Sequence, residues 1–148
     1  FHDPTHVLDE ARDGVERLLR SRLCASTPAQ HGYLEALRGD RGWLDERLES
    51  IRSRVDLCMG RIDSIEGLSC NRPGGAFYLF PRIIDQEKFP SDKEFVLNLL
   101  HEEHVLLVHG SGFSPVHGSG HFRLVALPPE DVLNDAFDRI DRFMRAHP

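Results

Sequence analysis

The order of helical and strand patterns along the chain predicts an α+β fold, with a small, mostly antiparallel sheet of short strands covered by helices. Three observations support this prediction. Apolar residues recur at helical spacing through the first 62 residues. Short apolar runs, bounded by glycine and proline, follow between residues 68 and 127. A second helical stripe then closes the chain between residues 132 and 144.

The composition is that of an ordinary globular protein. The 148 residues, of which 40% are hydrophobic and 28% charged, predict a single domain over residues 1–148. The formal net charge of -6 argues against nucleic acid or an anionic membrane as a partner. No apolar run is long enough to cross a bilayer, and no signal-peptide pattern is visible. The three cysteines lack CxxC spacing, which favours reduced thiols and a cytoplasmic location.

Three helices are predicted first. The pair Asp3-Pro4 suits an N-cap followed by the first helical position, and it opens a helix over residues 4–23. The second helix begins with a Thr27–Gln30 capping box and ends near Gly39. The third begins at Asp40. Its predicted buried stripe shares one helical face and comprises Leu44, Leu48, Ile51, Val55, Cys58 and Ile62.

Short strands are predicted next. A strand before a turn at Arg72–Gly75 and an aromatic-rich strand at Ala76–Phe80 indicate a hairpin. A capping box at Ser91–Glu94 begins the fourth helix. A βαβ-like connection through Ser91–His104 is the alternative that would add a parallel pair. The next buried strand is Val105–Val108.

The C-terminal part of the chain predicts one more strand and one more helix. The strand covers His121–Leu127, and Pro128-Pro129 ends it and starts the helix. The helix is predicted to bury one apolar face, made of Val132, Leu133, Ala136, Phe137, Ile140, Phe143 and Met144.

A tetrad His-Gly-Ser-Gly occurs twice, beginning at His109 and at His117. Together with His121, these histidines could hold zinc, but spacings of eight and four in loop and strand match no metal motif, and solvated loop histidines are the alternative. The backbone of the glycine-rich loop could bind phosphate, but a strand follows it rather than a helix. Ser111 lacks the strand-to-helix elbow of a catalytic serine. Metal, phosphate and nucleophile are therefore weak interpretations.

Arg123 lies inside an apolar run on the predicted strand. If Phe122, Leu124 and Ala126 face one side, Arg123 faces the other. A desolvated guanidinium needs an acidic partner or an anionic ligand, and its planar fork matches a carboxylate in two parallel hydrogen bonds. From the pattern alone, a structural ion pair, an exposed strand face and a ligand-binding role are three open interpretations.

Three separated stretches occur in the order and spacing of one known family. They are Arg22–Gln30 (RLCASTPAQ), Arg72–Ile83 (RPGGAFYLFPRI) and Val105–Pro128 (VLLVHGSGF to HFRLVALP). Together they resemble the C-terminal, small domain of class I/II aminotransferases, which are fold-type I pyridoxal-phosphate enzymes. Within that family the sequence is most similar to the alanine and aspartate aminotransferase-like branch, over nearly the whole chain.

The resemblance implies a substrate-binding role for five residues of this chain. Arg123 would bind the substrate α-carboxylate in a bidentate pair, and Gly75, Ser111, Gly112 and Phe113 would lie beside the substrate. The resemblance places no catalytic residue, no cofactor-binding residue and no metal ligand in this chain.

The resemblance further implies that pyridoxal 5'-phosphate is bound mainly by a large domain upstream, from which the helix over residues 4–23 leads in. Neither Lys88 nor Lys93 matches the Schiff-base lysine, so this chain alone is expected to be inactive. The full-length enzyme, expected to be a cytoplasmic homodimer, would move an amino group between an alanine-, aspartate- or glutamate-like amino acid and a 2-oxo acid. The alternative is an aminotransferase-like regulatory or small-molecule-binding module without transaminase activity.

Overall fold

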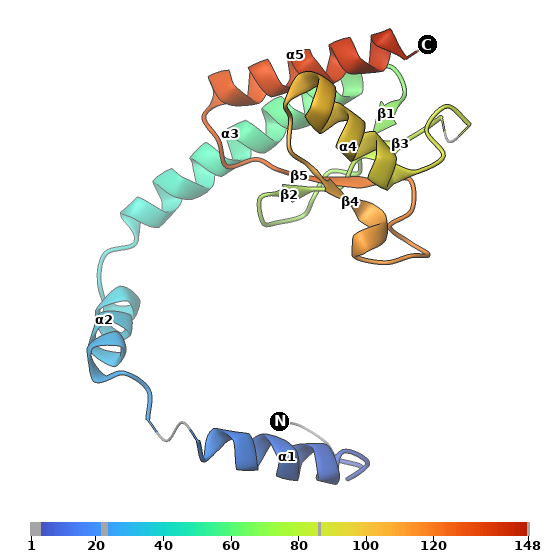
Figure 1. Ribbon diagram of the computed structural model, residues 1–148. Helices are drawn as coiled ribbons and strands as arrows, with labels where there is room; N and C mark the ends of the chain where they lie inside the picture. Colours follow the sequence, from blue (N-terminus) through green and yellow to red (C-terminus); the bar gives the residue numbers. More distant parts are fainter. Residues whose placement is uncertain (1–3, 22–23, 86, 148) are drawn as a thin grey trace. The chain divides into compact units, whose positions relative to one another are not determined.

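The computed structural model describes residues 4–21, 24–85 and 87–147 (Figure 1). These residues form helices and short antiparallel strands, which confirms the predicted α+β class. The chain divides into two compact units, residues 1–43 and 44–148. The single domain over residues 1–148 stays a prediction. In the described part of the chain, no helix is both long enough and apolar enough to cross a membrane.

The first unit begins with helix α1 (Asp9–Leu19), which is shorter than the helix predicted over residues 4–23. The predicted start at Pro4 is wrong, because His6 has a φ of 57°, and this left-handed conformation does not fit a helix. At the other end, Arg20 is the C-cap. The predicted N-cap Asp3 and the predicted helix end at residue 23 lie outside the described residues.

Helix α2 (Thr27–Arg38) has Gly39 as its C-cap, as predicted. The predicted Thr27–Gln30 capping box is wrong. Thr27 is already helical, so its hydroxyl is not placed to cap, and the N-cap residue Ser26 makes no side-chain cap hydrogen bond. The Gln30 side-chain amide instead donates to the Ala25 carbonyl at 3.0 Å.

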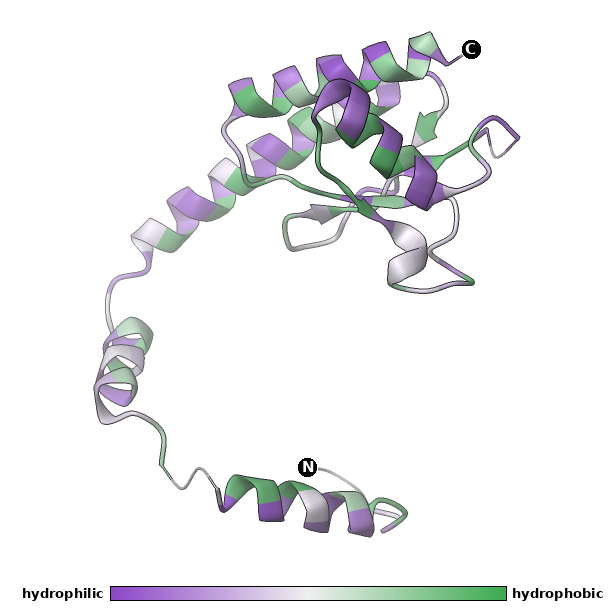
Figure 2. Ribbon diagram, viewed as in Figure 1, coloured by the Kyte–Doolittle hydropathy of each residue, from purple (hydrophilic) through white to green (hydrophobic). Residues whose placement is uncertain are grey.

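Neither helix of the first unit buries a residue. Figure 2 shows apolar and polar residues interleaved along both helices. Large apolar side chains in these helices, and just before α1, are exposed: Val7, Leu8, Val15, Leu18, Leu19, Tyr33, Leu34 and Leu37. The helical spacing therefore predicted the helices correctly, but these side chains have no buried core in their own unit.

Helix α3 (Gly42–Ser64) begins after Asp40, whose carboxylate accepts the Gly42 N–H at 3.1 Å. Of the predicted stripe, the C-terminal members Val55, Cys58 and Ile62 are buried. The burial predicted for Leu44 and Leu48 is wrong, because the first turns of α3 extend past the strands and helices that cover its other end (Figure 1).

Within the described residues, five strands form two small antiparallel sheets. In the first, β1 (Leu68–Ser69) pairs with β3 (Arg82–Ile83). In the second, β5 (Phe122–Val125) lies between β2 (Tyr78–Leu79) and β4 (Val108–His109). The described strands of the second sheet therefore meet around β5, which carries Arg123.

The predicted hairpin across Arg72–Gly75 is wrong, because β1 and β2 do not pair with each other. The chain does not close a tight turn there. It continues through a run of bends in which Ala76 has a φ of 60°, and this directs Tyr78 to pair with Val125 of β5. The βαβ-like alternative over Ser91–His104 is also wrong, since β4 runs antiparallel to its partner.

The core of the second unit lies where α3, α4 (Asp92–Glu103) and α5 (Glu130–Ala146) cover the strands (Figure 1). Phe95 of α4 stacks on Phe122 of β5 at 5.4 Å and meets Phe143 of α5 edge-on at 5.5 Å. The predicted face of α5 is buried at Leu133, Phe137, Ile140, Phe143 and Met144. Only Val132, which is 50% exposed, was wrongly placed in the core, and Ala136 is partly buried against it.

The three thiols should differ sharply in reactivity. Cys24 is exposed, whereas Cys58 is buried, and this burial raises the pKa of the Cys58 thiol to about 11. At pH 8 only about one Cys58 in a thousand carries the reactive thiolate. We expect a thiol-specific reagent followed by mass spectrometry to label Cys24 first and Cys58 only after unfolding. Equal labelling rates for both residues in the native protein would contradict the packing around α3.

Candidate carboxylate-binding site

Arg123 lies in the central strand of the three-stranded sheet. Its neighbours Phe122 and Leu124 are buried on the core side, so the alternation predicted for this strand is confirmed. On the flanking strands, Val108 is paired with Arg123 and Tyr78 with Val125. The Arg123 side chain therefore leaves the face of the sheet that is opposite to the core.

Two aromatic rings hold the Arg123 guanidinium. Its central carbon lies 4.8 Å from the centre of the Tyr78 ring and 4.6 Å from the centre of the Phe113 ring. Both separations are within the range of a cation–π contact. A cation–π contact of this kind uses the charge of the guanidinium and leaves its N–H groups available as donors. The two rings thus contact the guanidinium without replacing a hydrogen-bond acceptor.

The hydrogen-bonding capacity of Arg123 is incompletely used. Its Nε is buried and has no hydrogen-bond partner among the described residues, and no acidic side chain in that part of the chain forms an ion pair with it. A buried donor without an acceptor is costly, so a bound ligand or a water molecule is needed to complete the bonding of this atom. The observed geometry suits a planar anion such as a carboxylate.

The loop that carries Phe113 contains the short 3-10 helix η1 (Gly110–Gly112). The Ser111 N–H donates to the Asp92 carboxylate at 2.7 Å, and the Gly112 N–H donates to Nδ1 of His109 at 3.1 Å. The Phe113 N–H closes the turn on the Gly110 carbonyl at 2.9 Å. Consecutive backbone groups are therefore bonded up to the residue that stacks on Arg123.

The two His-Gly-Ser-Gly tetrads meet at their first glycines. A Cβ atom added to Gly110 would collide with the Gly118 carbonyl, and one added to Gly118 would collide with the Gly110 carbonyl. Their backbones pack directly on each other, and only glycine allows this approach. The repeat therefore has a structural reason, since each copy supplies one of the two contacting glycines.

The three histidines of this region have separate surroundings. His109 contacts the Ser111 hydroxyl at 3.0 Å, and the His117 N–H donates to the Ser114 hydroxyl at 3.1 Å. The His121 ring stacks on Phe80 at 5.2 Å. Across residues 4–21, 24–85 and 87–147, no group of three or more His, Cys, Asp or Glu side chains is arranged to hold a metal ion.

The structure brings most of the predicted site residues together. Phe113 contacts Arg123, and Ser111 and Gly112 belong to the turn that precedes Phe113. Both Ser111 and Gly112 direct their N–H groups into the supporting network. Gly75 lies in the exposed bends before Tyr78, with open space around its Cα.

Sequence reasoning missed two contributors. Tyr78 was assigned only to an aromatic-rich strand, whereas its ring contacts the Arg123 guanidinium. Asp92 was hidden inside a capping-box pattern, because an acidic residue is common in the first turn of a helix. Alternation along Ala76–Phe80 was the available signal for Tyr78, but no local signal indicated a buried Asp92.

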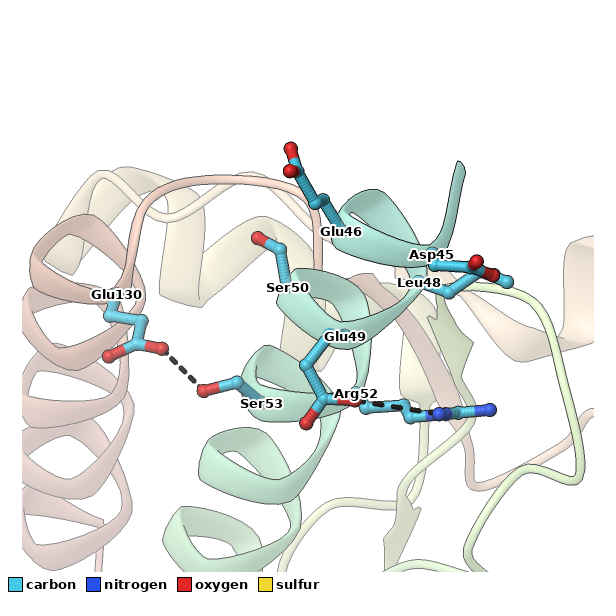
Figure 3. A pocket seen from close by; sticks show the side chains of 8 residues that line it. All are labelled: Asp45, Glu46, Leu48, Glu49, Ser50, Arg52, Ser53 and Glu130. Carbon is cyan, nitrogen blue, oxygen red and sulfur yellow. Dashed lines mark hydrogen bonds and ion pairs between the residues drawn. The ribbon is translucent and has the colours of Figure 1, made fainter. Parts of the chain in front are cut away.

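A separate surface depression lies along the first half of α3 (Figure 3). Its lining is mostly acidic or hydroxylic and comprises Asp45, Glu46, Leu48, Glu49, Ser50, Arg52, Ser53 and Glu130. The Ser53 hydroxyl donates to the Glu130 carboxylate at 2.7 Å. With four carboxylates and one arginine, this depression repels anions and is not a site for a carboxylate.

Comparison with known proteins identifies the family of this chain. The family model described as "Aminotransferase class I and II" matches residues 6–140. The chain therefore belongs to the class I and II aminotransferase family, which confirms the resemblance derived from its sequence.

Two solved structures and one curated protein illustrate the relationship. The glutamate-pyruvate aminotransferase AlaA of Haemophilus influenzae is 39% identical over 152 residues, covering 97% of this chain and 36% of that protein. Alanine aminotransferase from Pyrococcus furiosus is 45% identical with a TM-score of 0.85, over 97% of this chain and 36% of its own. Aspartate aminotransferase from Rhizobium meliloti is 32% identical with a TM-score of 0.77. The match covers 82% of this chain and 32% of the Rhizobium protein. The chain thus spans about a third of each relative.

Proposed function

We propose that residues 1–148 are the C-terminal substrate-binding domain of a pyridoxal-phosphate aminotransferase. The full-length enzyme would transfer an amino group between an amino acid of the alanine, aspartate or glutamate type and a 2-oxo acid. The single observation that carries this proposal is Arg123, whose guanidinium contacts two rings and whose buried Nε has no hydrogen-bond partner among the described residues. Family membership and the names of the relatives, glutamate-pyruvate and alanine aminotransferases, support the same substrates.

In this proposal Arg123 binds the α-carboxylate that the amino acid and the 2-oxo acid share. Tyr78 and Phe113 keep the guanidinium plane fixed and exclude water from its faces, so less ordering is needed when substrate binds. Ser111, Gly112 and Gly75 shape the substrate side of the site. Fixing one end of the substrate orients its Cα–H bond toward the groups that react.

Pyridoxal 5'-phosphate, when bound, supplies the electron sink for the reaction. The two lysines of this chain have other surroundings. The Lys88 amine donates to the Met144 carbonyl at the end of α5 at 3.2 Å, and Lys93 lies in the exposed first turn of α4. We therefore assign the cofactor, and the lysine that holds it, to a large domain outside this chain, and we expect this chain alone to be inactive.

The exposed apolar residues of α1 and α2 support a partner for the first unit. We propose that the enzyme's own large domain, within a homodimer, covers these helices. With reduced thiols and a net charge of -6, we place the enzyme in the cytoplasm, with no nucleic acid or membrane as partner.

Amino-group transfer by the full-length protein tests this proposal. With pyridoxal phosphate, glutamate and pyruvate, we expect alanine and 2-oxoglutarate to form in equal amounts. The 148-residue chain, assayed in parallel, should form neither product. Saturable binding of amino acids by a full-length protein that transfers no amino group would instead favour a binding or regulatory module.

A further inference from the structure

Asp92 is a charged residue whose burial is not explained by its place in the first turn of α4. Its residue is 6% exposed, and it is the one charged residue found in the core among those that the structure describes. The N-terminus of α4 is already capped by Ser91, whose hydroxyl accepts the Glu94 N–H at 3.2 Å. Burying a carboxylate is unfavourable unless other groups bond to it, so its partners indicate its purpose.

The partners of Asp92 belong to the loop beside Arg123. Its Oδ2 accepts the Ser111 N–H at 2.7 Å and lies 3.8 Å from Nδ1 of His109. The same His109 nitrogen is 3.0 Å from the Ser111 hydroxyl and accepts the Gly112 N–H at 3.1 Å. The carboxylate thus holds the middle residue of η1 directly, and α4 is the element that carries the carboxylate.

The next residue along the loop is Phe113, whose ring lies 4.6 Å from the Arg123 guanidinium. Strand pairing strengthens the connection, because His109 is paired with Phe122 and Val108 with Arg123. A shift of the loop would therefore move Phe113 relative to the guanidinium while the strand beneath stayed in place.

We propose that Asp92 is a positioning residue for carboxylate recognition, acting through the Ser111 N–H and Phe113 on the guanidinium of Arg123. This inference rests on the proposed function. Asp92 does not touch the substrate; it keeps the loop in the one arrangement in which Phe113 covers Arg123. Loss of its charge would leave the fold in place but would let the Phe113 ring move away from the Arg123 guanidinium. Part of the binding free energy of the substrate would then be spent on ordering this loop again.

The test uses the full-length enzyme with Asp92→Asn, which keeps the size of the side chain and removes its charge. We expect KM for both the amino acid and the 2-oxo acid to rise about tenfold, because a hydrogen bond to a charged acceptor is replaced by a weaker neutral one. We expect kcat to change less than threefold. Hydrogen exchange, measured by mass spectrometry on peptides that span residues 109–116, should become faster.

Two comparisons separate positioning from general destabilisation. Asp131→Asn is the matched control, since Asp131 also lies in the first turn of a long helix but is exposed; its KM and loop exchange should stay at wild-type values. In a Phe113→Leu background, Asp92→Asn should raise KM by less than twofold further, because the group through which it acts is already gone.

The outcomes are distinguishable. Unchanged KM or unchanged exchange in an active Asp92→Asn enzyme overturns the inference, and so does an effect of full size in the Phe113→Leu background. If Asp92→Asn fails to fold, Phe113→Leu is measured alone; a KM within twofold of wild type overturns the inference, because Asp92 is proposed to act through that ring. A wild-type protein that transfers no amino group overturns the proposed function itself.

Discussion

Replacing Arg123 with alanine is expected to lower kcat/KM for amino-acid substrates by about 100- to 1000-fold. Removing one partner of a desolvated, hydrogen-bonded charge pair costs about 2–5 kcal/mol, and each 1.4 kcal/mol is a factor of ten. The loss would come from the substrate carboxylate, because Arg123 has no acidic partner among the described residues. Steady-state kinetics of the full-length enzyme measures the effect, with cofactor content checked by absorbance.

Two variants make this result specific. Arg123→Lys keeps the positive charge but loses the planar fork between Tyr78 and Phe113, so it should recover only a small part of the activity. Arg145→Ala, on the exposed end of α5, is the control for loss of an arginine and should match wild type. Activity of Arg123→Ala within threefold of wild type would remove Arg123 from the site.

Gly110→Ala and Gly118→Ala should each destabilise the protein by about 2–3 kcal/mol, the upper part of the range for overpacked sites. Each new methyl group would meet the carbonyl of the other glycine, and backbone atoms cannot rotate away as a side chain would. The turn before Phe113 should therefore open, and KM should rise together with the loss of stability. Urea unfolding and exchange over residues 109–121 measure the two effects.

Gly60→Ala is the matched control. Gly60 lies inside α3, and nothing within 4 Å would meet a Cβ added there. In a helix interior alanine is favoured over glycine by about 0.5–1 kcal/mol, so this change should stabilise the protein. A loop variant that behaves like Gly60→Ala would show that the two tetrads do not pack as described.

Periodicity along the chain was sufficient to predict helices but not what covers them. The α5 stripe from Leu133 to Met144 is buried because α5 packs against other elements of its own unit, among them α4, where Phe143 meets Phe95 at 5.5 Å. Residues such as Leu18 and Tyr33 follow the same spacing and are exposed. Spacing encodes which face is apolar, whereas burial depends on which element lies opposite, and that is a property of the tertiary fold.

Strand pairing was the least predictable feature. Two short strands around Arg72–Gly75 favour a hairpin by proximity alone, but Ala76 adopts a positive φ that its sequence does not signal. The site shows the same limit. Arg123 could be identified from its apolar neighbours and from the family resemblance, whereas Asp92 reaches its loop partner Ser111 only through long-range folding.

The most direct test of carboxylate recognition compares L-alanine with ethylamine, which is the same amine without the carboxylate. The ratio of kcat/KM for these two substrates isolates the contribution of that group. We predict that the full-length wild-type enzyme strongly prefers L-alanine and that Arg123→Ala lowers this preference by about 100-fold or more. A preference that is the same in both enzymes would show that another residue binds the carboxylate and would contradict the role of Arg123.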